Sequence, residues 1–159
     1  MIANESGSAA ATTMILLPLL LVVLTGALEL GALRAVAYRA TAAADLATLV
    51  AINDHDEVEQ TRSGALRPSA DAEQVARAYF AMNLSSTAVA LADSPGAIAA
   101  SADIAVFRIA PATDPATGWT YARPAVRIVA RVPVRTPAFR ALLLPAVTTV
   151  TVRAASSAR

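Results

Sequence analysis

The sequence predicts an α+β fold. A long N-terminal transmembrane helix continues into a small domain with a second helix and an antiparallel sheet of three to four strands. Three observations predict this fold. No charged residue occurs from Ser8 to Leu28. A helical pattern then runs from Ala32 to Asn53 without Gly or Pro. Near the C-terminus apolar residues alternate with polar ones, as in half-buried strands.

The predicted boundaries follow from these patterns. We expect a leader over residues 1–7, a long helix over residues 8–53 that spans a membrane in its first half, and an outer α+β domain over residues 54–159. At 1.5 Å per residue the uncharged run forms a helix about 30 Å long, which matches the hydrocarbon thickness of a bilayer. Pro18 lies inside this run, and spanning helices tolerate proline.

Three interpretations of the apolar run compete: a cleaved signal peptide, a retained anchor, and a helix that packs beside similar helices. A signal peptide has a basic N-terminal region, whereas Glu5 is the only charged side chain before the run. An Ala-x-Ala pattern occurs at residues 35–37, but it lies beyond Glu29 and Arg34. We therefore expect the helix to be retained.

The helix beyond the span carries a narrow face of small and apolar residues at spacings of three and four: Leu30, Leu33, Ala37, Ala40, Ala44, Ala47 and Ala51. Such a face lets another backbone approach closely. We expect it to contact another helix in an assembly, so that Leu at Ala40 or Ala44 blocks assembly without unfolding the outer domain. The alternative is an ordinary alanine-rich helix, because Ala has the highest helix propensity.

Glu29 lies near the end of the span and has two interpretations. It is either an interfacial carboxylate that reaches the headgroups or the partner of a cation on a neighbouring helix, because unmatched charges in a membrane are costly. We group it with the predicted packing residues.

The segment from Asn53 to Ser69 is polar and predicts a loop. Its acidic cluster, Asp54 to Glu59, includes the only histidine, His55. The spacing fits no calcium-binding loop, so a solvated acidic loop is favoured over a metal site.

A second helix is expected after Asp71, which is a candidate N-cap followed by Gln74, and it stops near Asn83. Its predicted buried face contains Val75, Ala78, Tyr79 and Met82. Strands are expected at residues 103–110, 125–134 and 147–154, with a fourth in residues 87–100 that turns at Asp93 to Gly96. In the second of these strands Pro133 indicates an edge or a strand end.

Composition limits the chemistry. The 159 residues include no Cys and one His, and the formal net charge is +1. We find no catalytic constellation, no metal site and no phosphate-binding loop, so we expect neither an enzyme, a cofactor nor a small-molecule substrate. Arg127, Arg131 and Arg135 form a stripe on one strand; a solvated face is favoured over phosphate or nucleic-acid binding.

Several elements occur together in a familiar order: Gly7 to Ala10, Leu17 to Leu21, Glu29 to Gly31 and Ala42 to Ala47, followed by Ala76 to Leu84. The first third of the chain resembles the N-terminal region of TadE/TadG-like proteins of the tight-adherence (Flp-type) pilus system. The remainder is similar in layout.

The resemblance implies a type IV pilin-like minor pilin or pseudopilin whose partners are other pilins and the inner-membrane assembly platform. It implies a single-pass protein of the cell membrane with its C-terminal domain outside the cytoplasm, or one incorporated in a pilus. Arg34 and Arg39 favour the opposite orientation, and we follow the resemblance. Processed relatives are cut after the leader Gly, here the bond between Gly7 and Ser8, and usually carry Glu at the fifth residue after the cut, where this chain has Thr12. The alternative function is a single-pass anchored binding domain of another envelope or secretion complex.

We predict that the mature protein keeps the apolar helix. Mass spectrometry of membrane-extracted protein should find an N-terminus at Met1, Ile2 or Ser8. An N-terminus near Tyr38 would identify a signal peptide and contradict the pilin-like interpretation.

Overall fold

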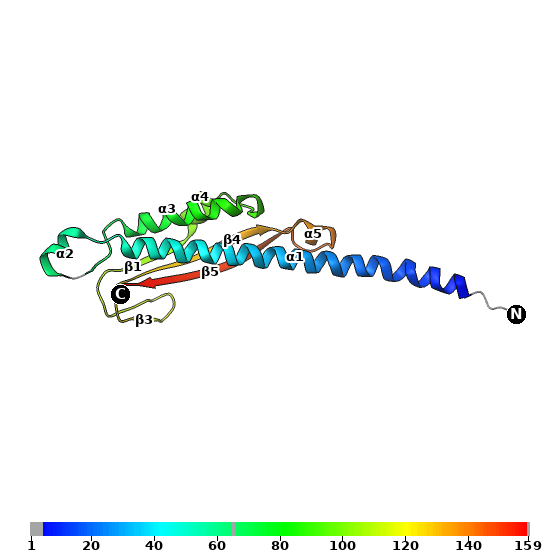
Figure 1. Ribbon diagram of the computed structural model, residues 1–159, viewed down its shortest axis with the longest axis horizontal. Helices are drawn as coiled ribbons and strands as arrows, with labels where there is room; N and C mark the ends of the chain where they lie inside the picture. Colours follow the sequence, from blue (N-terminus) through cyan, green and yellow to red (C-terminus); the bar gives the residue numbers. More distant parts are fainter. Residues whose placement is uncertain (1–4, 65, 159) are drawn as a thin grey trace.

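The computed structural model describes residues 5–64 and 66–158 and confirms the α+β fold (Figure 1). Its dominant helix is α1, Glu5–Asn53. One antiparallel sheet contains β1 (Asp103–Phe107), β4 (Ala125–Arg135) and β5 (Val147–Ser157), and a smaller hairpin contains β2 (Ala112–Thr113) and β3 (Thr120–Tyr121). The other helical segments are α2 (Glu57–Ser63), α3 (Ala72–Leu84), the 3-10 helix η1 (Ser85–Ala90), α4 (Pro95–Ser101) and α5 (Pro137–Ala141).

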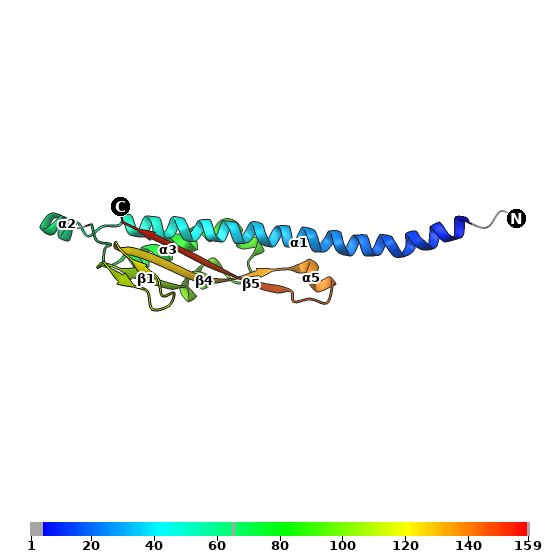
Figure 2. The same cartoon turned by 90° about the horizontal axis from the view of Figure 1, so that it is seen from below.

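Helix α1 is continuous over 49 residues and includes Pro18. At 1.5 Å per residue it is about 70 Å long. Its first half projects from the domain, and its second half lies along the sheet (Figures 1 and 2). Buried residues of α1 begin at Val36. The second half of α1 therefore supplies part of the core of the folded unit, together with elements of the predicted outer domain that begins at residue 54.

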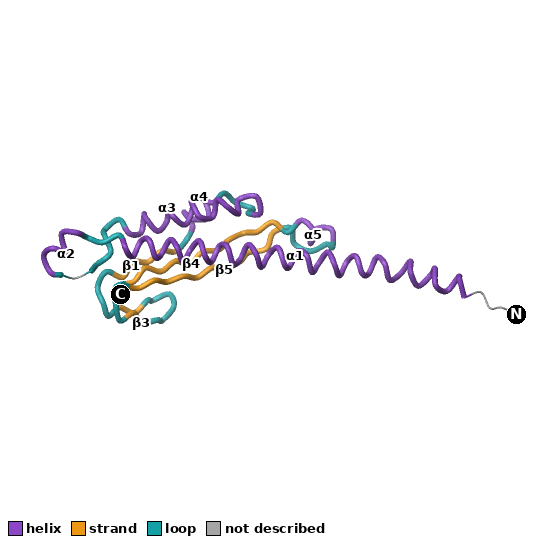
Figure 3. The backbone as a smooth tube through the Cα atoms, viewed as in Figure 1, coloured by secondary structure: helices purple, strands orange, loops and turns teal. Residues whose placement is uncertain are grey.

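The core lies between one face of the sheet and a helical layer of α1 and α3 (Figure 3). The predicted apolar series of strand β4 is buried, namely Val126, Ile128, Ala130, Val132 and Val134, and Ala125 and Arg127 of the same strand are buried as well. The facing residues of α1 are mostly alanines, with Ala40, Ala44, Ala47 and Ala51 fully buried. Because a methyl group takes little space, α1 approaches both the sheet and α3 closely.

Helix α3 begins after Asp71 as expected, but it buries a different face. Its buried residues are Ala72, Ala76, Phe80 and Leu84, whereas Tyr79 and Met82 of the predicted face are exposed. Apolar residues occur on both faces of α3, so the spacing alone did not decide between them. The decision comes from contacts with α1 and α4, which cover the Phe80 side.

Two segments differ from the sequence-based expectation. Residues 87–100 contain no strand; they form parts of η1 and α4 instead. Helix α4 starts with Pro95, and the Ser94 hydroxyl accepts a hydrogen bond from Ala97 N–H at 3.2 Å, a common helix start. The predicted loop at residues 53–69 contains α2, which Asp56 caps by accepting a hydrogen bond from Glu59 N–H.

The sheet order is β1-β4-β5, so Pro133 lies in the central strand. Strand β1 pairs only with residues 125–129 of β4. Beyond that point β4 has a free side, where the Pro133 carbonyl accepts a hydrogen bond from Ala92 N–H at 2.9 Å. In a strand the N and C=O of one residue face the same side, so the missing N–H of Pro133 removes no bond to β5. Strand β4 is thus central in the sheet, contrary to the expectation of an edge or a strand end, and Pro133 is accommodated because β1 does not extend to it.

We predict that Ala44→Leu destabilises the domain by about 1–3 kcal/mol, because it overpacks a fully buried contact. Ala42→Leu is the matched control, since Ala42 is exposed on the same helix and Leu is nearly as good a helix former as Ala. Thermal unfolding of the full-length protein in one detergent measures both. Equal melting temperatures for the two variants would contradict the core position of Ala44.

Candidate functional site

The first half of α1 is the most exposed apolar surface of the described chain. Side chains from Met14 to Leu24 stand in solvent on every side of the helix. Among the described residues, α1 is the one helix long and apolar enough to cross a membrane. A helix that is apolar all round and touches no protein is typical of a membrane span.

The candidate processing bond between Gly7 and Ser8 lies in the first turns of α1, where the backbone is helical. The exposed apolar side chains that the structure describes begin at Met14, nearly two turns beyond Ser8 on the same helix.

The predicted packing residues separate into two groups. Ala40, Ala44 and Ala47 are fully buried in the chain's own core, between the sheet and α3, and Leu33 and Ala37 at its edge are half-buried. The alanine face is therefore covered by its own domain. Because these alanines support the domain itself, we expect larger side chains at Ala40 or Ala44 to destabilise it. The sheet and α3 of the same chain pack on the narrow face of small residues that the sequence shows.

Glu29 lies where α1 leaves the domain. It lines a groove with Leu33 and Val36 of α1 and with Thr136 and Pro137, which follow β4. Its Oε1 atom is buried and has no hydrogen-bond partner in the described structure. Arg135 lines the same groove, but no ion pair joins the two side chains among the described residues. Glu29 thus marks the junction between the exposed and the packed halves of α1.

Two buried charged residues, Arg127 and Asp114, form an ion pair on the outer face of the sheet that no sequence pattern predicted. Arg127 was expected to be solvated with Arg131 and Arg135, yet only the latter two are exposed. The side chain of Arg127 is 5% exposed; its Nη1 donates to Asp103 Oδ2 at 3.0 Å, and its Nε lies 2.8 Å from Asp114 Oδ2. The contact with Asp114 is an ion pair without hydrogen-bond alignment.

Asp114 also organises the β2–β3 hairpin. Its carboxylate accepts hydrogen bonds from Ala116 N–H at 3.0 Å and from the Thr117 hydroxyl at 2.6 Å. Burial by itself raises the pKa of Asp114, but these hydrogen bonds and the charge of Arg127 outweigh it and lower the pKa below the ordinary 3.8. The carboxylate is therefore ionised at neutral pH and holds the hairpin to β4.

Tyr121 of the hairpin packs on Phe107 of β1, with 5.1 Å between ring centroids. Burial and the nearby Asp114 carboxylate raise the pKa of Tyr121. Together with Trp119, Arg127 and Arg153 it lines a shallow cleft of about 300 Å³. The sequence signal for this arrangement was the Asp-Pro-Ala-Thr-Gly turn, which places Asp114 beside the sheet; no periodic pattern shows which arginine it meets.

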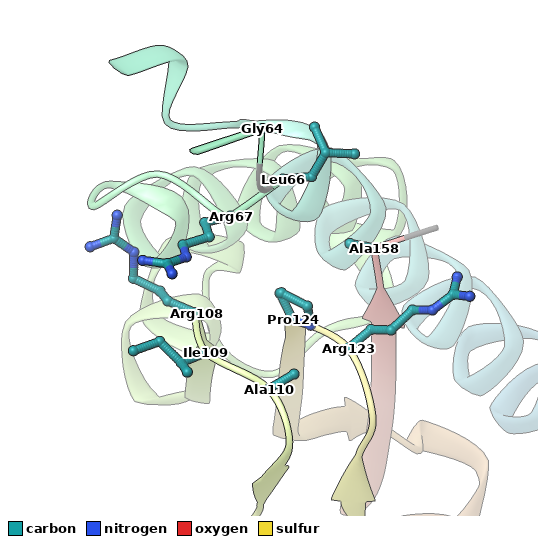
Figure 4. A pocket seen from close by; sticks show the side chains of 9 residues that line it. All are labelled: Gly64, Leu66, Arg67, Arg108, Ile109, Ala110, Arg123, Pro124 and Ala158. Carbon is teal, nitrogen blue, oxygen red and sulfur yellow. The ribbon is translucent and has the colours of Figure 1, made fainter. Parts of the chain in front are cut away.

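A second cavity, of about 420 Å³, lies at the end of the domain far from the apolar half of α1 (Figures 1 and 4). Three arginines line it: Arg67, Arg108 and Arg123. Figure 4 shows that the guanidinium groups of Arg108 and Arg123 point away from each other. Arg67 pairs with Glu59 at 3.2 Å and Arg108 with Asp56 at 3.0 Å, so these arginines do not converge on an anion.

The same ion pairs explain the acidic segment from Asp54 to Glu59. Asp56 and Glu59 pair with these two arginines, and Asp54 accepts a hydrogen bond from the Ser69 hydroxyl. No three His, Asp or Glu side chains of the described residues are grouped as metal ligands. The segment fastens α2 to the rest of the domain.

No family model, no curated protein and no solved structure matches this chain.

We predict that Asp114→Asn lowers the free energy of unfolding at pH 7 by about 3 kcal/mol, because it breaks a buried ion pair. The folded-state pKa of Asp114 is lowered, so its stabilisation is complete above the unfolded-state pKa near 4 and is lost as the pH falls through the folded value. Melting temperatures of wild type and variant should therefore converge below pH 4. Asp93→Asn, at an exposed position, is the control; a constant difference between Asp114→Asn and wild type across pH would contradict the assignment.

Proposed function

We propose that this chain is a minor pilin-like structural subunit of a tight-adherence (Flp-type) pilus or of its assembly machinery, related to TadE/TadG-like proteins. One observation carries the proposal: α1 is a single continuous helix with two different halves. Its apolar side chains from Met14 to Leu24 are exposed, whereas residues from Val36 onward pack in the core of a small α+β domain. This is the architecture that the resemblance of residues 7–47 implies for a type IV pilin-like protein.

The two halves of α1 suit a subunit that leaves the membrane to enter an assembly. The exposed half contacts lipid before assembly and helices of other pilins afterwards, since both surroundings are apolar. The second half is fixed in the core, so the position of the helix determines the position of the domain. In this proposal the domain stands outside the cytoplasm and the partners are other pilins and the inner-membrane platform.

The face that a neighbouring subunit can reach differs from the alanine face. Beyond the span, the outward side of α1 exposes Tyr38, Ala42, Leu46 and Leu49. These residues follow a helical spacing on the side opposite the core. We propose this outward face, together with the apolar first half, as the surface that packs in an assembly.

A second candidate function is a single-pass anchored domain that binds an envelope or secretion partner. The outer face of the sheet favours it, because Arg131, Arg135 and Arg153 are exposed there. No acidic residue follows Asp114 in the sequence. This basic face suits an acidic partner.

A span replacement separates the two functions. We predict that replacing residues 9–28 with alternating Leu and Ala of equal length keeps the protein in the membrane but abolishes pilus yield and co-purification with other pilins. An anchor needs only length and hydrophobicity, whereas a packed helix needs its own side chains.

The matched variant changes Arg131, Arg135 and Arg153 to Gln and leaves the span intact. The pilin-like function predicts normal assembly for it. Normal assembly by the span replacement together with failure of the arginine variant would overturn the proposal in favour of the anchored binding domain.

A further inference from the structure

The connection between β4 and β5, residues 136–146, contains α5 and lies at the end of the domain nearest the apolar half of α1 (Figures 1 and 2). Helix α5 contacts α1 directly. In both views it lies beside the middle of α1, further toward the N-terminus than any other part of the domain.

The burial of residues on α1 shows which turn of the helix lies beside this connection. Thr136 and Pro137 line the groove that contains Glu29 and Leu33. One turn earlier on α1, Thr25 and Gly26 are half-buried, whereas residues 12–24 are exposed all round the helix. The connection therefore lies beside the last turn of the uncharged run, which ends at Leu28. If that run spans a bilayer, this level is the boundary between hydrocarbon and headgroups.

The tip of the connection displays apolar side chains to solvent. Leu143 is 96% exposed and Leu144 is 51% exposed. Phe139 and Leu142 are half-buried beside them. Arg140, on α5, and Arg135, at the end of β4, are exposed next to this tip.

The backbone at Leu143 makes this display unusual. Its φ is +60°, a left-handed conformation that is sterically unfavourable for an ordinary L-residue. Leu143 N–H donates to the Arg140 carbonyl at 3.1 Å, and Leu144 N–H donates to the Phe139 carbonyl at 2.9 Å. This is the helix-ending arrangement in which the left-handed position is usually Gly. The chain thus holds its most exposed leucine at a position where Gly would fit the backbone better, and such strain is common at functional sites.

We propose that the tip formed by Phe139 to Leu144 inserts into the interfacial layer of the membrane that α1 spans, as a second membrane contact of the domain. Apolar side chains flanked by arginines suit the boundary of a leaflet that contains anionic lipids. Lipid is favoured over a second copy of the chain, because the tip lies at the end of the span, where lipid surrounds α1.

The contact has a consequence for the domain. A domain held by one helix can tilt and rotate over the membrane, whereas a domain held at α1 and at the tip presents one fixed side to the membrane and another to its partners. This inference rests on the membrane-spanning part of the proposed function and not on the pilus.

Because the chain has no Cys, single cysteines can carry an environment-sensitive NBD probe. Full-length protein with Leu143→Cys, Leu20→Cys or Val58→Cys is reconstituted in vesicles of phosphatidylcholine and phosphatidylglycerol that contain doxyl-labelled lipids. Leu20 lies in the proposed span, and Val58 is the control because it is exposed on α2 at the far end of the domain. We expect blue-shifted emission and lipid quenching at positions 143 and 20, and neither at position 58.

Each other outcome overturns the tip contact in a distinguishable way. Quenching at position 20 without quenching at position 143 would leave the span intact and reject the tip. A blue shift at position 143 without lipid quenching would mean that protein covers the tip. Absence of quenching at position 20 would reject the span and, with it, both proposals.

A second variant tests the leucine itself without unfolding the turn. Leu143→Asn keeps the left-handed position, which Asn tolerates, and removes the apolar side chain. With a probe at Leu144→Cys, we expect this variant to lose most of the lipid quenching and to keep the melting temperature of the domain. Unchanged quenching would show that α1 alone holds the connection at this level and would overturn the insertion of Leu143.

Discussion

The structure depends on the close packing of alanines in the second half of α1 against the sheet and α3. At Ala40, Ala44 and Ala47 a methyl group is the whole side chain, so the helix axis can lie near the strands. Larger partners fill the space from the other side, with Phe80 of α3 and Ile128 of β4 fully buried. The same contact fixes the second half of α1 to the domain from which its first half projects.

The outer face of the sheet is stabilised differently. In the described part of the chain no second helical layer covers it, and the β2–β3 hairpin covers only one end. There the buried Arg127 pairs with the exposed Asp103 and the buried Asp114, so removal of Asp114 takes away the buried partner of a buried charge. The apolar contact of Tyr121 with Phe107 lies beside the ion pairs. Directional charge pairs position the hairpin, whereas apolar burial on the inner face stabilises the fold.

The long axis of the molecule runs from an apolar end to a charged end. At one end the apolar side chains of α1 from Met14 to Leu24 are exposed, and Leu143 and Leu144 of the α5 connection are exposed beside this half of the helix. At the other end Asp56 and Glu59 pair with Arg108 and Arg67 around α2. This polarity fits the proposed membrane span, which would leave the charge pairs in water and place the leucines at the membrane boundary.

The sequence by itself determined the elements whose residues repeat with a clear period. The uncharged run, the continuous helix to Asn53 and strand β4 were predictable, because side-chain spacing reports directly on helix and strand geometry. Only the tertiary structure decided which partner each face meets. The alanine face could serve another subunit or its own domain, the buried face of α3 could be either of two, and Arg127 could be solvated like Arg131. In each case the local residue spacing is compatible with either partner at similar free energy. Contacts between residues far apart in the chain determine which partner the face meets.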